Sequence, residues 1–216
     1  MDLQDTFKHK GLRKQLVETI IAKGITNKEV IEAIGKIKRH LFVESYLQEA
    51  AYQDRALPIP AGQTISQPFT VAFQTELLQI KKGDKVLEVG TGSGYQTAVL
   101  LEVGAKVYTI ERVKELYVKV RTLLEKMGYK ANFFYGDGYE GKPTYGPFDK
   151  ILITAGAPYI PENLLLQLKV GGILVAPIGE GDLQIMTEIV KVSENDFLKR
   201  THGNFAFVPM LKGVVK

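Results

Sequence analysis

The chain has 216 residues, 45% of them hydrophobic, and its 28 basic and 24 acidic residues give a net charge of +4; this is enough to bury one well-packed domain. It contains no cysteine, which excludes disulfides, zinc–thiolate sites and thiol nucleophiles. The start, Met1–Asp5, lacks the basic-then-apolar pattern of a secretory signal and no apolar run is long enough to cross a membrane, so we expect a cytoplasmic location.

The first predicted elements are two amphipathic helices. Apolar residues recur at roughly helical spacing over residues 5–22, and Gly24 then predicts a stop. The tetrapeptide Thr26–Glu29 has the form of a capping box, in which the Thr26 hydroxyl and the Glu29 carboxylate each accept a terminal N–H of the second helix. Because one face of each helix is apolar, both helices need a partner surface.

An unusual polar loop follows irregular connecting chain that ends at Pro60. Gly62–Phe69 runs from this loop into a helix predicted over Phe69–Leu78. Pro68 fits the first turn of that helix, because its missing N–H would have no partner there in any case. By itself this pattern favours the interpretation of Ser66 as a hydroxyl at a helix start.

Residues 85–95 predict a strand, a tight turn and a helix. Three glycines spaced two apart, Gly90–Gly94, follow the apolar run, and Glu88 lies two places before the first of them. Glycine allows positive φ and close approach of the backbone to a ligand, and the next helix presents unpaired N–H groups. The dinucleotide fingerprint requires a third glycine where this chain has Tyr95. The turn therefore predicts a cradle for another small molecule, with an unrelated α/β turn as the alternative.

From residue 85 onward the pattern alternates strand and helix, which predicts an α/β fold with a mostly parallel sheet covered by helices on both faces. We expect residues 80–216 to form this sheet domain and residues 1–79 to form a helical segment and loop packed on it. About seven strands are predicted, at 86–89, 106–110, 131–135, 148–154 and 173–177, with two later runs at 185–192 and 205–209.

Three predicted sites meet at one edge of this sheet, because the carboxyl ends of parallel strands face the same crevice. The glycine turn follows the first strand, Glu111 ends the second, and Asp137-Gly138 follows the third. Glu111 lies 21 residues after Gly90, about the separation at which an acid accepts ribose hydroxyls. Asp137 suits an adenine amino group. Either acid alone is interpreted as a surface carboxylate, but together they indicate a bound adenosine.

The glycine turn after an acid-ended strand resembles the first motif of S-adenosylmethionine-dependent methyltransferases with a Rossmann-like fold. Nearly the whole chain is similar to one family among them, the protein-L-isoaspartate O-methyltransferases. The Ile-Ser-Gln-Pro sequence at residues 65–68 is the most specific match. The segments that carry the resemblance are Val86–Tyr95, Asp54–Ile59, Thr64–Pro68, Thr154–Pro158, Gly171–Gly179 and Phe207–Pro209.

The resemblance implies transfer of a methyl group from S-adenosylmethionine to the free α-carboxylate of isoaspartyl residues in damaged proteins and peptides, with S-adenosylhomocysteine as the product. It implies that Ser66 is the active-site serine that holds the carboxylate, and that Val208 and Pro209 contact the peptide. The residues it implies for the cofactor are Thr64, Ile65, Gln67, Glu88, Gly90, Thr91, Gly92, Ser93, Gly94, Glu111, Asp137 and Gly138.

The implied chemistry matches the residues available. A carboxylate is already ionised at neutral pH, so its attack on a sulfonium methyl needs no general base. His9, His40 and His202 lie outside the motifs and are interpreted as surface or packing residues, and the sequence indicates no metal site.

Two other functions remain open from the sequence. An RNA base methyltransferase would share the fold and use the mild positive charge, but basic and aromatic residues are not clustered as nucleic-acid binding predicts. A non-catalytic adenosine-binding module would be expected to have lost Ser66. We therefore expect no nucleic acid and no membrane as partners, and the oligomeric state is open.

Overall fold

The computed structural model describes residues 4–215. The first three residues of Met1–Asp5, the segment predicted not to be a secretory signal, lie outside the described residues. Seven strands form one sheet in the order β5-β4-β3-β6-β7-β8-β9. The strands from β3 to β7 are parallel to one another, and β8 is antiparallel to both β7 and β9. The predicted mostly parallel sheet is confirmed. Its strands are β3 (Lys85–Val89), β4 (Lys106–Glu111), β5 (Asn132–Tyr135), β6 (Phe148–Ile153), β7 (Leu168–Ile178), β8 (Gln184–Lys191) and β9 (Phe197–Phe205).

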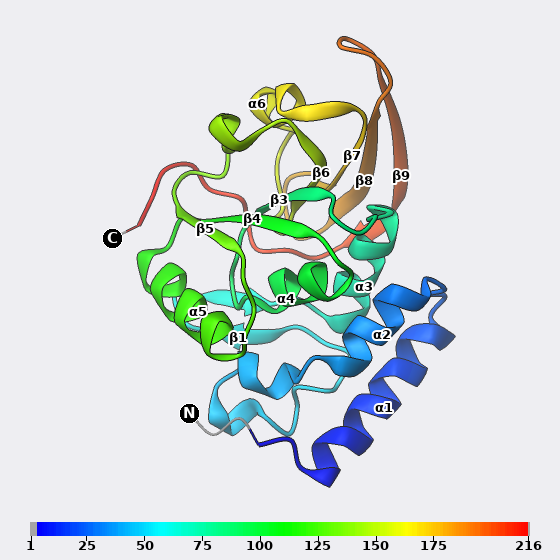
Figure 1. The fold of residues 1–216 in the computed structure, drawn as a ribbon, viewed down its shortest axis with the longest axis vertical. Helices are drawn as coiled ribbons and strands as arrows, with labels where there is room; N and C mark the ends of the chain where they lie inside the picture. Colours follow the sequence, from blue (N-terminus) through cyan, green and yellow to red (C-terminus); the bar gives the residue numbers. More distant parts are fainter. Residues whose placement is uncertain (1–3, 216) are drawn as a thin grey trace.

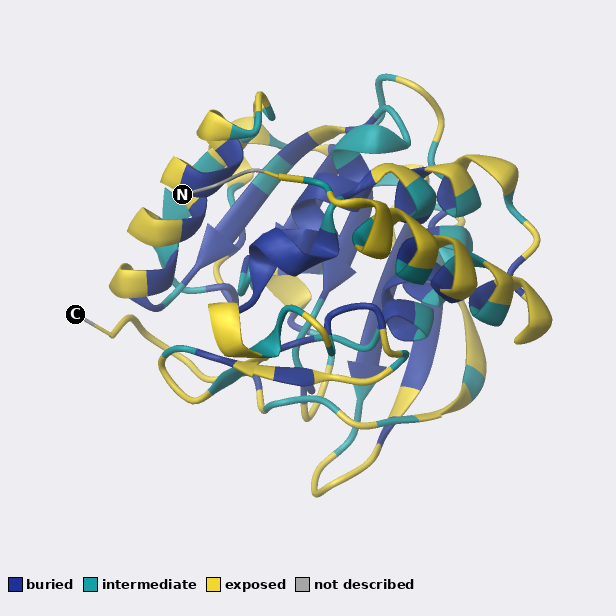
Figure 2. Ribbon diagram, turned by 90° about the horizontal axis from the view of Figure 1, so that it is seen from below, coloured by how far each residue is buried: buried dark blue, intermediate teal, exposed yellow. Residues whose placement is uncertain are grey.

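Helices cover both faces of the sheet, as the alternating side chains of β3 illustrate. Val86 packs in one core cluster with Leu78 and Leu100, beside α3 and α4, whereas Leu87 packs in another with Leu164 of α6. Both faces of the central strands are therefore buried (Figure 2). The helical elements are α1 (Phe7–Ala22), α2 (Lys28–Lys36), η1 (Arg39–Phe42), η2 (Ser45–Leu47), α3 (Pro68–Leu77), α4 (Tyr95–Glu102), α5 (Lys114–Lys126), η3 (Pro143–Tyr145) and α6 (Glu162–Leu166).

The two N-terminal helices lie side by side at one end of the molecule (Figure 1). Leu16 and Ile20 of α1 and Ile34 of α2 are almost fully buried, in the same core cluster as Val99 of α4 and Leu124 of α5. Burying one such side chain contributes about 1.5–3 kcal/mol. The apolar faces of these helices are therefore buried in one core with side chains of α4 and α5. Among residues 4–215, no helix has both the length and the apolar composition needed to cross a bilayer.

The chain before Ser66 is not entirely irregular. Two short strands, β1 (Leu57–Ile59) and β2 (Gln63–Ile65), pair antiparallel as a hairpin, with Pro58 opposite Thr64. Pro58 excludes a helix, as predicted, but an isolated two-stranded edge tolerates a residue without an N–H. Ser66 directly follows the second strand of this hairpin.

The predicted capping box at the start of α2 is wrong. Asn27 is the N-cap, and its side chain accepts from the backbone N–H of Val30 at 3.0 Å. Thr26 instead donates its N–H and its hydroxyl to the Glu76 carboxylate of α3. Glu76 lies 50 residues further along the chain, so the local sequence could not predict this contact. A capping box does occur at the first helix, between Thr6 and His9.

The prediction for the last strand is also wrong in position. The strand runs over Phe197–Phe205, and the predicted run at 205–209 lies mostly beyond it. All but two residues of β9 are exposed, so the strand carries no alternating apolar pattern. Residue Pro209 still makes an isolated bridge with Gly156, which brings the C-terminal chain to the carboxyl edge of the sheet.

Candidate active site

A cavity lies where the carboxyl ends of β3, β4 and β6 meet. It is bordered by the glycine turn after β3, by the end of the β1–β2 hairpin and by the chain that follows β9. Elements far apart in the sequence therefore converge on one site, as expected for a parallel sheet. Among the predicted site residues, those that line this cavity are Thr64, Ile65, Ser66, Gly90, Thr91, Gly92, Ser93, Glu111, Gly138 and Pro209.

Glu111 fastens the glycine turn to the end of β4. One carboxylate oxygen accepts from the backbone N–H of Gly92 at 2.9 Å, and the other accepts from Val113 at 2.9 Å. Each oxygen keeps a second lone pair for a ligand hydroxyl. Glu111 can thus order the turn and still accept hydrogen bonds from the cavity.

Five predicted site residues do not border the cavity: Gln67, Glu88, Gly94, Asp137 and Val208. Asp137 accepts from the backbone N–H groups of Tyr139 and Gly213, and the Val208 carbonyl accepts from Gly156. These contacts hold the C-terminal chain against the loops after β5 and β6. Asp137 and Val208 are therefore placed to shape the cavity wall.

Glu88 lies under the glycine turn with none of its surface exposed. One oxygen accepts from the Thr97 hydroxyl at 2.5 Å, and the other has no hydrogen-bond partner among the described residues. Burial raises the pKa of Glu88 to about 8, against the opposing effect of the nearby Thr97 and Thr109 hydroxyls. The carboxyl is therefore mostly protonated at neutral pH.

Sequence reasoning missed several lining residues. Thr154 follows β6, and its hydroxyl donates to the carbonyl of Gly90 at 2.6 Å. Its place at the end of a predicted strand could have indicated it, since that edge already held three predicted sites. Tyr95 and Gln96 begin α4, and no pattern distinguishes them from ordinary core residues. The other lining residues not predicted are Gln63, Val71, Val89, Ile110, Arg112, Ala155, Met210 and Leu211.

Ser66 lies at the junction between this cavity and an outer groove. The groove has a volume of about 570 Å³, and Thr64, Ser66 and Thr154 line both spaces. Its other walls include Phe69 of α3 and Phe205, with Phe207 beyond β9. A small molecule in the cavity and an extended chain in the groove would therefore meet at Ser66.

Ser66 does not act as the helix-start hydroxyl that the local pattern favoured. The N-cap of α3 is Gln67, which makes no capping hydrogen bond. Instead, one carboxylate oxygen of Asp54 accepts from the backbone N–H of Phe69 at 2.8 Å, and the other accepts from the Gln67 side chain at 3.0 Å. Because a distant carboxylate stabilises the helix start, the serine hydroxyl is not needed there.

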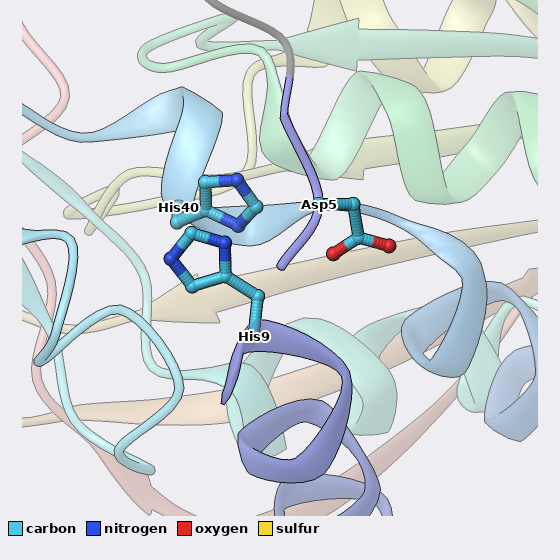
Figure 3. Close-up of side chains that lie close together, drawn as sticks. All are labelled: Asp5, His9 and His40. Atoms are coloured by element: carbon cyan, nitrogen blue, oxygen red, sulfur yellow. The ribbon is translucent and has the colours of Figure 1, made fainter. Parts of the chain in front are cut away.

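Asp5, His9 and His40 form the one group of described residues whose potential metal-ligating atoms all lie within 4.8 Å of one another (Figure 3). The two imidazole rings are stacked, with centroids 3.8 Å apart. Asp5 binds Arg13 through both oxygens, and both ring nitrogens of His40 have partners, the Tyr52 hydroxyl and a backbone carbonyl. The donor atoms are thus already engaged, and we interpret the cluster as packing that fastens the N-terminal segment.

The chain matches a family model over residues 11–215, described as protein-L-isoaspartate(D-aspartate) O-methyltransferase. It is 60% identical over 211 residues to the protein-L-isoaspartate O-methyltransferase of Flavobacterium psychrophilum, covering 97% of this chain and 99% of that protein. The enzyme of the same name from Dictyoglomus thermophilum is 46% identical over 210 residues, covering 97% and 94% of the two chains.

Solved structures are also similar to this chain, and one of them carries the same enzyme name. A structure described as a putative protein-L-isoaspartate O-methyltransferase from Plasmodium falciparum, in complex with S-adenosyl-L-homocysteine, superposes with a TM-score of 0.81 at 27% identity, over 95% of this chain and 99% of that one. A precorrin-6y C5,15-methyltransferase from Geobacter metallireducens has a TM-score of 0.51 at 15% identity, over 70% and 91% of the chains, which shows a shared fold alone. The chain belongs to the protein-L-isoaspartate(D-aspartate) O-methyltransferase family.

Proposed function

We propose that this chain transfers a methyl group from S-adenosylmethionine to the free α-carboxylate of isoaspartyl residues, leaving S-adenosylhomocysteine. The observation that carries the proposal is the position of Ser66 between an inner cavity and an outer groove. The relatives named above support the same reaction. The methyl ester then cyclises to a succinimide, whose hydrolysis returns part of the product to normal aspartate.

The residues of the cavity suit S-adenosylmethionine. Glu111 has acceptor capacity left for ribose hydroxyls. Gly90 and Gly138 line the cavity, and a Cβ at either would lie within 2.5 Å of a neighbouring side chain, so these two positions of the lining require glycine. The remaining proposed contacts that line the cavity are Thr64, Ile65, Thr91, Gly92 and Ser93. The other predicted cofactor residues, Gln67, Glu88, Gly94 and Asp137, do not border it and are proposed only to support its walls.

In the reaction, the bound cofactor supplies an electrophilic methyl group on a sulfonium. The chain itself needs no general base, because the substrate carboxylate is ionised at neutral pH. Ser66 donates a hydrogen bond to that carboxylate and holds it at the entrance to the cavity. Alignment of this kind lowers a barrier by several kcal/mol.

The peptide around the isoaspartyl residue is proposed to lie in the outer groove. Phe69, Phe205 and Phe207 supply apolar surface there, and Val208-Pro209 is proposed to contact the peptide backbone. The partners are therefore isoaspartyl proteins and peptides rather than nucleic acid. The two segments, 1–79 and 80–216, are proposed to act as one unit, since one core cluster contains side chains of both.

A matched pair of peptides tests the reaction. The peptides are identical except that one contains isoaspartate and the other aspartate, and methyl transfer from labelled S-adenosylmethionine is followed for both. We expect a base-labile methyl ester on the isoaspartyl peptide alone. If neither peptide is labelled although the cofactor binds, the proposal is wrong and RNA substrates become the next to test.

Replacing Ser66 by alanine tests its role. We expect turnover of the isoaspartyl peptide to fall by about 10- to 100-fold, since one hydrogen bond to a charged group is lost, whereas cofactor affinity should change by less than about threefold. Ser193, a partly buried serine in the β8–β9 connection that contacts Asp196, provides the matched Ser193→Ala control. Unchanged turnover in Ser66→Ala would remove the proposed role.

A further inference from the structure

Arg39 is a buried arginine beside the active-site loop, and nothing above gives it a role. It begins η1, and none of its surface is exposed. Its Nη2 donates to the carbonyl oxygen of Ser66 at 2.8 Å, and its Nε donates to that of Ala51 at 2.8 Å. The guanidinium lies 4.5 Å from the ring centroid of Tyr95. One side chain thus connects the chain before β1, the Ser66 loop and the first residue of α4.

This arrangement is costly for a residue that only fills space. Arg39 takes part in none of the ion pairs formed by residues 4–215, and its Nη1 has no hydrogen-bond partner among them. Burial lowers the pKa of Arg39 to about 10, so the side chain is charged at neutral pH. Since an unpaired buried charge is destabilising, a methionine of similar length would pack here at less cost. What arginine provides here, and methionine would not, is a pair of N–H donors that bind the carbonyls of Ala51 and Ser66.

The contacts of Arg39 fix Ser66 itself. Asp54 holds the residues that follow Ser66, since its carboxylate accepts hydrogen bonds from Gln67 and Phe69. Within residues 4–215, the hydrogen bond from Arg39 is the one that reaches the Ser66 backbone from another segment. Tyr95, whose ring centroid lies 4.5 Å from the guanidinium, lines the cofactor cavity and is 1% exposed. The guanidinium therefore sets the spacing between Ser66 and the cavity wall.

We propose that Arg39 is a positioning residue for methyl transfer, which holds Ser66 at the junction of cavity and groove by bonding its carbonyl while packed on Tyr95. The inference rests on the proposed role of Ser66. Arg39 does not touch the substrate and acts through the serine.

Two variants test this role, Arg39→Met and Arg39→Lys. Arg39→Met keeps the length of the side chain without donors, and we expect kcat per cofactor-binding site to fall at least about tenfold while the Kd of S-adenosylhomocysteine stays within about threefold. Arg39→Lys retains the charge but cannot bridge two carbonyls in the same way. We expect an intermediate loss in kcat, about threefold, with the KM for the cofactor unchanged.

Arg13 provides the matched control. It is another buried arginine of the N-terminal segment, 8% exposed, and its side chain bonds Asp5, Gly35 and Tyr52 but no cavity residue. Arg13→Met should lower the Tm and leave kcat per cofactor-binding site within about twofold of wild type. If Arg39→Met matches this control in kcat, Arg39 is only structural and the proposal is wrong. If Arg39→Met does not fold, wild-type kcat in Arg39→Lys overturns it.

Measuring Ser66→Ala in parallel distinguishes a failure of the Arg39 role from a failure of the proposed function on which that role rests. A wild-type protein that fails to methylate the isoaspartyl peptide overturns the proposed function. Normal turnover in Ser66→Ala overturns the role of the serine and, with it, that of Arg39. A defect in Ser66→Ala without one in the Arg39 variants overturns the positioning role alone.

Discussion

Gly90→Ala should reduce the affinity for S-adenosylhomocysteine by about 100-fold or more. Gly90 has φ +100°, where an L side chain costs roughly 1–2 kcal/mol. An added Cβ would also lie 2.5 Å from the Thr154 hydroxyl, which donates to the Gly90 carbonyl. Both effects displace the turn that lines the cavity. Isothermal titration of S-adenosylhomocysteine measures the loss.

Gly128→Ala separates backbone strain from the contact with Thr154. Gly128 follows α5 with φ +84°, but a Cβ there meets no atom within 4 Å. This control should lose some thermal stability and keep the cofactor affinity of wild type. Affinity within about threefold of wild type in Gly90→Ala would show that the turn accommodates the methyl group, contrary to the steric argument.

The sheet could be predicted from the sequence because its central strands are buried on both faces and appear as apolar runs between turns. Four of the five predicted parallel strands, β3, β4, β5 and β6, start and end within one residue of prediction. The strand β7 begins at Leu168, five residues before its predicted start, and includes Gly171 and Gly172, two residues that strands rarely contain. The exposed β9 was misplaced, since an edge strand facing water needs no apolar pattern.

The site could be predicted in outline for a different reason. Parallel strands place their following loops at one edge, so Glu111 and Gly138 could be assigned to the site of the glycine turn without coordinates. Sequence position does not reveal whether a side chain at that edge faces the cavity or the core. Glu88 is the clearest example, because the alternation of the strand turns it toward Thr97 of α4.

Contacts between segments that lie far apart in the chain could not be predicted from the sequence. Asp54 caps a helix that begins 14 residues later, and Glu76 binds the start of α2 across 50 residues. In the sequence, Arg39 has the appearance of a surface arginine next to His40. Each is a long-range contact of a polar side chain, which no local pattern encodes.

The buried carboxyl of Glu88 should make the folded protein less stable as the pH rises. Its pKa moves from 4.5 to about 8 on folding. Between these values the folded state holds a proton that the unfolded state has released, so the free energy of unfolding falls with increasing pH. The stabilisation from the protonated carboxyl is fully present below pH 4.5 and is lost as the pH passes 8. The total loss in the free energy of unfolding over this pH range is on the order of a few kcal/mol.

Glu88→Gln should remove this dependence, because an amide stays neutral and its oxygen can still accept from Thr97. Denaturant unfolding at pH 6 and pH 9 should show a smaller loss of unfolding free energy in Glu88→Gln than in wild type. Glu125→Gln, at an exposed glutamate of α5 paired with Arg121, controls for the loss of one carboxyl and should follow wild type. Equal losses in all three proteins would mean that Glu88 ionises in the folded state without cost, through water or a rearrangement of Thr97.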